Sequence, residues 1–283
     1  MKNILFIGIS FLLLVSCQKK EIKTPPRCIY DLSVFAECSE GAAKNEELFA
    51  TFKQNPFFNL LWENSSEEEG ALWMEKIAAC YPELLKKLER IKESDRIGSP
   101  RVYSYQEYGE FSPATLRFAA LGGEIEERCG NLAELNVIQI GAGYGGLCKV
   151  LHATSGFKTY TLVDLPQQLA LAKRYLDVFG VNNVSYLTPE ELPLGVHYDL
   201  VLSDRSFSEF NRSFQVLFFD RILAHSHSGF LLGHLFPKHY GVQPLSFDEL
   251  KSRFDKKGNF ARWEIQEPTI ESENYFIFWK QDT

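Results

Sequence analysis

The sequence predicts an α/β protein whose core is a doubly wound, mostly parallel sheet. From residue 136 onward, short apolar runs alternate with amphipathic stretches, and this alternation is typical of βαβ units with parallel strands. A glycine-rich turn, Gly141-Ala142-Gly143-Tyr144-Gly145-Gly146, directly follows the apolar run at 137–140. Glycines between a strand and a helix let the backbone turn tightly and approach a ligand, which indicates a nucleotide-cofactor site.

The first seventeen residues form a segment of their own. Lys2 precedes an apolar run at 4–15, which ends in Leu14-Val15-Ser16-Cys17. Such a run is too short to span a hydrocarbon core of about 30 Å comfortably, but it suits the core of a signal peptide. The segment resembles a bacterial lipoprotein signal, in which Cys17 becomes the lipidated N-terminus. An uncleaved anchor and a misassigned start codon remain the alternatives.

Residues 18–130 divide into a tether and a helical region. Residues 18–30 are short, polar and basic with two adjacent prolines, as expected of a tether. In the helical N-terminal region, 31–130, apolar residues recur at three- and four-residue steps between about 46 and 95. The positions are Leu48, Phe49, Phe52, Leu72, Ile77, Tyr81, Leu84, Leu85, Leu88 and Ile91. The pattern predicts two helices, and Ser112-Pro113 predicts the start of another that leads to Gly122-Gly123.

The remaining domain, 131–283, contains the elements of the sheet. The predicted strands lie at 137–141, 160–164, 184–187, 198–203, 229–236, 262–266 and 275–280, and the predicted helices at 147–154, 166–179, 207–225 and 247–256. The last two strands could form a terminal antiparallel hairpin.

Charge and cysteine usage narrow the choice of partners. The formal net charge is -7 in 283 residues, without a long Lys/Arg run, so nothing favours nucleic acid as the substrate and a small acceptor is expected. The six cysteines include no C-x-x-C pair and no His cluster accompanies them, so no metal site is predicted. A disulfide between Cys28 and Cys38 stays open beside ordinary thiols.

The glycines alone do not choose the cofactor. Gly141-x-Gly143-x-x-Gly146 satisfies the dinucleotide pattern, and Gly141-x-Gly143-x-Gly145 satisfies the S-adenosylmethionine pattern. Asp164 ends the next strand, where a carboxylate can accept both ribose hydroxyls of either cofactor. No second nucleotide-binding half follows, and 198–204 supplies a fourth strand at the spacing seen in methyltransferases. S-adenosylmethionine is therefore the expected cofactor.

Several motifs together resemble the class I S-adenosylmethionine-dependent methyltransferases, and within them the sugar O-methyltransferase family. They are Asp95-Arg96-Ile97-Gly98-Ser99-Pro100, Ser112-Pro113-Ala114-Thr115-Leu116-Arg117-Phe118, Ile140-Gly141-Ala142-Gly143-Tyr144-Gly145-Gly146-Leu147, Tyr160-Thr161-Leu162-Val163-Asp164-Leu165-Pro166 and Ser203-Asp204-Arg205-Ser206-Phe207-Ser208-Glu209-Phe210. The resemblance implies a seven-stranded Rossmann-like sheet with an N-terminal helical extension, and methyl transfer to a hydroxyl of a sugar or glycan precursor. The chain departs from the pattern at Gln139, where an acid is usual, and at Asp204-Arg205, where Asn and an aromatic are usual.

Cofactor binding is expected at six positions. The cofactor would approach the backbone closely at Gly141, Gly143 and Gly145, and Asp164 would bind the ribose of the cofactor. Gln139 would stand where the acid near the methionine end is expected. Arg117 could meet the cofactor's carboxylate or an acidic sugar, because a guanidinium fork suits a carboxylate, with a surface ion pair as the equal alternative.

Catalysis is expected from Glu209, Asp204 and His234. All three lie near the carboxyl ends of predicted strands, where open sheets bind ligands, and each could orient or deprotonate an acceptor hydroxyl. The alternatives are that Glu209 caps or pairs within its own helix and that His234 is a structural histidine.

The signal and the cofactor point to different compartments. S-adenosylmethionine is made in the cytoplasm, whereas a lipidated Cys17 would anchor the protein to a membrane of the cell envelope. An unprocessed signal or a downstream start would leave the enzyme cytoplasmic. The leading interpretation is a sugar O-methyltransferase, and the alternative is a membrane-anchored, non-catalytic lipoprotein that binds a glycan or a partner.

Overall fold

The computed structural model describes residues 32–234, 242–257, 264–266 and 274–281. Cys17, the tether at 18–30 and Cys28 lie outside the described residues, and so does the side chain of His234. Within the described ranges, no helix is long and apolar enough to cross a membrane.

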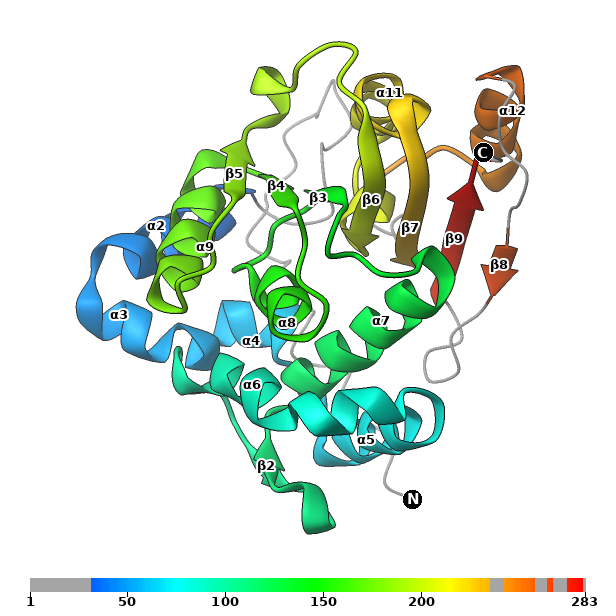
Figure 1. The fold of residues 1–283 in the computed structure, drawn as a ribbon. Helices are drawn as coiled ribbons and strands as arrows, with labels where there is room; N and C mark the ends of the chain where they lie inside the picture. The colour runs from blue at the N-terminus through cyan, green and yellow to red at the C-terminus, as the bar shows by residue number, and fades with distance from the viewer. Residues whose placement is uncertain (1–31, 235–241, 258–263, 267–273, 282–283) are drawn as a thin grey trace, which may run out of the picture.

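A large mixed sheet forms the centre of the molecule, with its strands in the order β5-β4-β3-β6-β7-β9-β8 (Figure 1). The strands are β3 (Asn136–Ile140), β4 (Thr159–Val163), β5 (Val184–Leu187), β6 (Tyr198–Asp204), β7 (Ser226–His234), β8 (Glu264–Gln266) and β9 (Asn274–Lys280). The pairs from β5 to β7 are parallel, whereas β9 runs antiparallel to both β7 and β8. The prediction of an α/β fold with a mostly parallel sheet is confirmed.

Helices cover both faces of this sheet. Side chains alternate along β3, so that Val137 packs in one hydrophobic cluster and Ile138 in the other. The first cluster also holds residues of the N-terminal helices, and the second holds residues of the helices near the C-terminus. The helices of the C-terminal half are α8 (Gly146–Thr154), α9 (Pro166–Val178), α10 (Ser206–Glu209), α11 (Arg212–Arg221) and α12 (Phe247–Lys257).

The N-terminal region contains more helices than the sequence predicts. They are α2 (Leu32–Lys44), α3 (Glu46–Thr51), α4 (Pro56–Trp62), α5 (Glu67–Cys80), α6 (Leu88–Lys92) and α7 (Pro113–Cys129). A small hairpin of β1 (Tyr103–Ser104) and β2 (Glu110–Phe111) precedes α7. Among the described residues, the 3-10 segments are Phe52–Gln54, Pro82–Lys87, Glu93–Arg96, Gln106–Tyr108, Pro189–Glu191 and Leu223–His225.

Two helix predictions were wrong in their extent. The helix expected at 207–225 is interrupted, because the side chain of Asn211 accepts a hydrogen bond from Phe214 N and starts α11 anew. The helix expected to end near Gly122-Gly123 continues instead to Cys129. A Cβ at Gly123 would lie 2.5 Å from the Tyr81 ring, so this glycine allows close packing rather than ending the helix.

The start of α7 agrees with the prediction. Ser112 Oγ accepts a hydrogen bond from Thr115 N at 3.1 Å, and Pro113 is the first helical residue. Asp95 reinforces this end, because its carboxylate accepts hydrogen bonds from Ser112 N and Thr115 Oγ1 at 2.8 and 2.7 Å. A negative charge at a helix N-terminus is stabilising, so Asp95 fixes the helix that carries Arg117.

Candidate functional site

The glycine turn lies at the carboxyl end of β3 and leads into α8. Gly141 has a φ of +83°, and a Cβ there would lie 2.0 Å from Ser206 Oγ. Gly145 has a φ of +88° and a Cβ there would lie 3.1 Å from Leu176 Cγ. A side chain at either position would meet both backbone strain and a close neighbour, so the turn is specific for glycine at these two points.

Gln139 lies under the turn and supports it from within the protein. It is 3% exposed, its Nε2 donates to the Gly141 carbonyl at 2.7 Å, and its Oε1 accepts from the Tyr160 hydroxyl at 2.6 Å. The predicted contact between Gln139 and the cofactor is untested. In this structure the amide fixes the carbonyl of Gly141, the first residue after β3.

A second amide holds the middle of the turn. The side-chain nitrogen of Gln168, in α9, donates to the Gly143 carbonyl, and Gln168 Oε1 accepts from Ser39 Oγ at 2.6 Å. Ser39 belongs to α2, and both side chains are fully buried. The N-terminal helices therefore help to set the conformation of the glycine turn, a role that the sequence pattern did not indicate.

Asp164 follows β4 directly and faces the turn. Its Oδ2 accepts from Ala142 N and its Oδ1 from Leu165 N, both at 2.8 Å. Burial raises the pKa of this carboxyl to about 6, although hydrogen bonds from backbone amides oppose the rise. Each carboxylate oxygen has two lone pairs, so Asp164 can still accept hydrogen bonds from a diol while it braces the turn.

A bidentate ion pair joins Arg117 of α7 to Asp204, the last residue of β6. Arg117 Nη1 lies 3.0 Å from Oδ1, and Nη2 lies 2.5 Å from Oδ2. Both side chains are 11% exposed, so the pair is largely buried rather than on the surface. The structure thus joins two predicted site residues to each other, at the carboxyl edge of the sheet.

The chain turns sharply after Asp204. Arg205 has a φ of +67°, and its N donates to Leu232 O at 2.7 Å. This turn starts α10 and places Glu209, which is buried, close enough for its charge to raise the pKa of Asp164. Asp204 and Glu209 therefore approach the edge that carries Asp164, whereas His234 ends β7 and its side chain lies outside the described residues.

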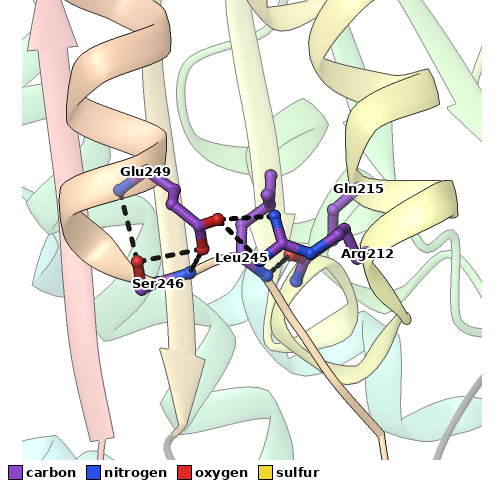
Figure 2. A network of polar contacts seen from close by, with 5 residues as sticks. All are labelled: Arg212, Gln215, Leu245, Ser246 and Glu249. Atoms are coloured by element: carbon purple, nitrogen blue, oxygen red, sulfur yellow. Dashed lines mark hydrogen bonds and ion pairs between the residues drawn. The ribbon is translucent and has the colours of Figure 1, made fainter.

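A polar network behind α10 holds this helix in place (Figure 2). Gln215 Nε2 donates to Phe207 O at 2.8 Å. Gln215 Oε1 accepts from Leu245 N at 2.6 Å. Both guanidinium Nη atoms of Arg212 donate to Glu249 at 2.6 Å. The network links α10, α11 and α12, and so fixes the segment that carries Glu209.

Two residues at the end of α4 lie against the glycine turn, and the sequence pattern missed both. A Cβ at Gly143 would lie 3.7 Å from Trp62 Nε1. Glu63 Oε1 accepts from the Tyr144 hydroxyl at 3.1 Å. Burial is the main cause that raises the pKa of Glu63 to about 7. Lys53 and Arg117 oppose the rise, and Asp95 adds to it. No spacing rule connects residues 62 and 63 to a turn about eighty residues later.

Lys53 is a buried cation beside these residues. It is 1% exposed, and its Nζ donates to Ser94 O at 2.9 Å. The same Nζ lies 4.8 Å from the centre of the Tyr144 ring and 5.5 Å from that of Tyr175. The hydrogen bond and the two aromatic faces compensate the charge inside the protein.

The described residues offer no metal site. No group of three or more His, Cys, Asp or Glu side chains among them is close enough together to hold a metal ion. Cys38, Cys80, Cys129 and Cys148 are free thiols, and burial raises the pKa of Cys129 to about 12. The Cys129 thiol is therefore a poor nucleophile and a poor metal ligand.

Comparison with known proteins gives similarity in structure only. The chain matches no protein-family model and no curated protein sequence. Protein 1320 of Thermoplasma acidophilum is 16% identical, with 72% of this chain and 98% of that one covered and a TM-score of 0.44. The N-terminal domain of EvdMO1 with SAH bound is 16% identical, with 70% of this chain and 96% of that one covered and a TM-score of 0.45. The methyltransferase domain of bacterial CtHen1-C is 13% identical, with 59% of this chain and 97% of that one covered and a TM-score of 0.46. At such low values, the function has to be inferred from the site itself.

Proposed function

We propose that the chain is an O-methyltransferase that binds S-adenosylmethionine at the carboxyl edge of β3 and β4. The observation that carries the proposal is the glycine turn with Asp164 beside it. The backbone of the turn can contact a ligand closely, and the carboxylate can accept hydrogen bonds from ribose hydroxyls. The carboxylate and the turn are already held together at 2.8 Å through Ala142 N. A nucleotide cofactor would therefore meet a site whose geometry is fixed in advance.

When bound, S-adenosylmethionine supplies an electrophilic methyl group. The protein has to hold a hydroxyl in line with that methyl, so positioning supplies much of the rate. Glu209 is our candidate to accept the hydroxyl proton, because it is buried close to Asp164. Asp204, which is paired with Arg117, would orient the acceptor rather than take its proton.

The proposed acceptor is a hydroxyl of a sugar or glycan precursor. This substrate class comes from the resemblance in the motifs, and the net charge of -7 is compatible with a neutral polyol. A competing proposal is a non-catalytic, membrane-anchored protein that binds a glycan or a partner. The neutral Gln139, which is engaged inside the protein, favours this alternative.

Calorimetric titration of S-adenosylmethionine into the full-length protein, kept in solution by a mild detergent, separates the two proposals. We expect micromolar binding that is lost in Asp164→Ala, because this variant removes the carboxylate and the brace of the turn. Well-folded wild-type protein that does not bind would contradict the enzyme proposal and leave the binding protein.

The membrane anchor is proposed separately, from Leu14-Val15-Ser16-Cys17. It would place the protein in the cell envelope, whereas an unprocessed signal would leave it in the cytoplasm. Metabolic labelling with palmitate should mark the wild-type chain and not Cys17→Ser. An unlabelled wild-type chain would remove the anchor without affecting the cofactor proposal.

A further inference from the structure

We infer that Glu63, at the end of α4, provides the negative charge that holds the ammonium group of the bound cofactor. The inference rests on the proposed function, since it concerns the same site. It assigns a ligand-binding role to a helix that lies far before the glycine turn in the chain.

The position of Glu63 is the first reason. Its Oε1 contacts the hydroxyl of Tyr144, a residue of the glycine turn, at 3.1 Å. The preceding residue, Trp62, lies against Gly143 of the same turn. Arg117, which meets Asp204 at the end of β6, is close enough for its charge to act on Glu63. Glu63 thus lies at the glycine turn, within the electrostatic range of Arg117.

The second reason is that the charge of Glu63 is available. In the described part of the chain, Glu63 forms no ion pair, and the Tyr144 hydroxyl is the one hydrogen-bond donor to its carboxylate. Glu63 keeps part of its surface exposed, although burial is the main cause of its raised pKa. The positive charge of Lys53 lowers the pKa of Glu63, but the Lys53 ammonium group donates its hydrogen bond to Ser94 O at 2.9 Å.

Other polar side chains near the turn have partners within the protein, and Glu209 is the proposed base for the acceptor hydroxyl. Asp164 accepts from two backbone amides, Asp204 is paired with Arg117, and Asp95 caps α7. Gln139 is neutral, and both of its polar atoms have partners inside the protein. An amino-acid ammonium bound here would therefore find its counter-charge at Glu63.

Binding of a cation should also change the protonation of Glu63. With a pKa of about 7 in the free protein, this carboxyl is partly protonated at pH 7. The charged groups that act on it are Lys53, Asp95, Arg117 and, by hydrogen bond, Tyr144. An ammonium group favours the ionised form, so ligand binding at pH 7 should release protons.

The test compares two ligands that differ in the amino-acid part. S-adenosylhomocysteine carries the ammonium group, and 5′-methylthioadenosine keeps the adenosine and the thioether without it. We would titrate each into full-length wild type, Glu63→Gln and Asp164→Ala, with exposed Glu83→Gln as the matched control. Glu63→Gln should weaken S-adenosylhomocysteine by about tenfold or more and leave methylthioadenosine unchanged. Asp164→Ala should weaken both ligands, and Glu83→Gln neither.

Proton release gives a readout that needs no variant. In buffers of different ionisation enthalpy at pH 7, wild type should release more protons on binding S-adenosylhomocysteine than on binding methylthioadenosine, because both ligands bring a ribose to Asp164 and only the first brings an ammonium group to Glu63. The inference about Glu63 would be overturned if Glu63→Gln weakened the binding of both ligands equally, or weakened neither. The proposed function would still stand in that case, provided that binding depends on Asp164. Wild type that binds neither ligand would overturn both.

Discussion

At the scale of single residues, the ion pair between Arg117 and Asp204 should contribute strongly to stability. Both side chains are 11% exposed, so removing one partner leaves a nearly buried charge without its main counter-charge. We expect Arg117→Met alone to lower the free energy of unfolding by about 3 kcal/mol, and the double change with Asp204→Leu to recover most of the loss. Urea denaturation measures both.

The exposed pair Lys173 and Asp177 is the control for that experiment. Its side chains are 58% and 56% exposed, so Lys173→Met should cost no more than about 0.5 kcal/mol. Similar losses in the two single variants would show that burial does not strengthen the pair between α7 and β6.

Glu63 gives stability a pH dependence of opposite sign to that of a typical surface carboxylate. Its folded pKa of about 7 lies above the ordinary value of 4.5, so the fold prefers the protonated form. The stabilisation is complete below about pH 4.5 and is lost as the pH rises through 7. We expect the urea midpoint to fall between pH 5 and 8, and to fall less in Glu63→Gln. Parallel profiles for the two proteins would show that Glu63 does not titrate in this range.

The residues of the site differ in how far the sequence could predict them. Gly141 and Asp164 follow strands directly, so their place at one sheet edge follows from local pattern and parallel pairing. Glu63 reaches the turn through the packing of α4, and no periodicity encodes that contact. Gln139 was correctly placed at the end of β3, but whether its amide faces inward depends on Tyr160 of the neighbouring strand.

At the scale of elements, the glycine turn should tolerate no side chain at Gly141. The residue combines a φ of +83° with a Cβ position 2.0 Å from Ser206 Oγ. We expect Gly141→Ala to lower the free energy of unfolding by about 3 kcal/mol, from strain and overpacking together, and to weaken S-adenosylmethionine binding. Gly156→Ala is the control, because Gly156 has a φ of +71° with nothing within 4 Å of its Cβ position. It should lose only about 1 kcal/mol, and equal losses would contradict the steric argument.

The elements after residue 136 were predicted more accurately than those before it. Buried strands of a parallel sheet are continuous apolar runs bounded by turns, and these are readable locally. Three of the N-terminal helices, α3, α4 and α6, are short and adjoin 3-10 segments, so the buried face shifts from one helix to the next. Leu48 and Leu72 were assigned to the apolar face, and yet they are 51% and 47% exposed.

At the scale of the whole molecule, the N-terminal helices and the sheet share one hydrophobic cluster. Phe52 and Ile77 from the helical region pack in the same cluster as Tyr144 and Tyr175 from the region after residue 131. The hydrogen bonds from Ser39 to Gln168 and on to Gly143 add a polar link between the two regions. The division at 130/131 remains a prediction, but the packing implies that neither part is stable alone.

We therefore expect the N-terminal helices and the sheet to unfold together in a single transition, with equal calorimetric and van't Hoff enthalpies. A chain that begins at Asn131 would expose Tyr144, Leu147 and Tyr175 to water, and each fully buried aromatic or leucine contributes about 2 kcal/mol of transfer free energy. Such losses approach the whole stability of a typical domain, so this chain should lack cooperative unfolding and bind an apolar dye. Ser39→Ala is the milder companion: it leaves the buried Gln168 Oε1 without its donor and should cost about 1 to 2 kcal/mol. Two resolved transitions in the full-length protein, or a cooperative fold in the shortened one, would show that the sheet is independent of the helices that cover it.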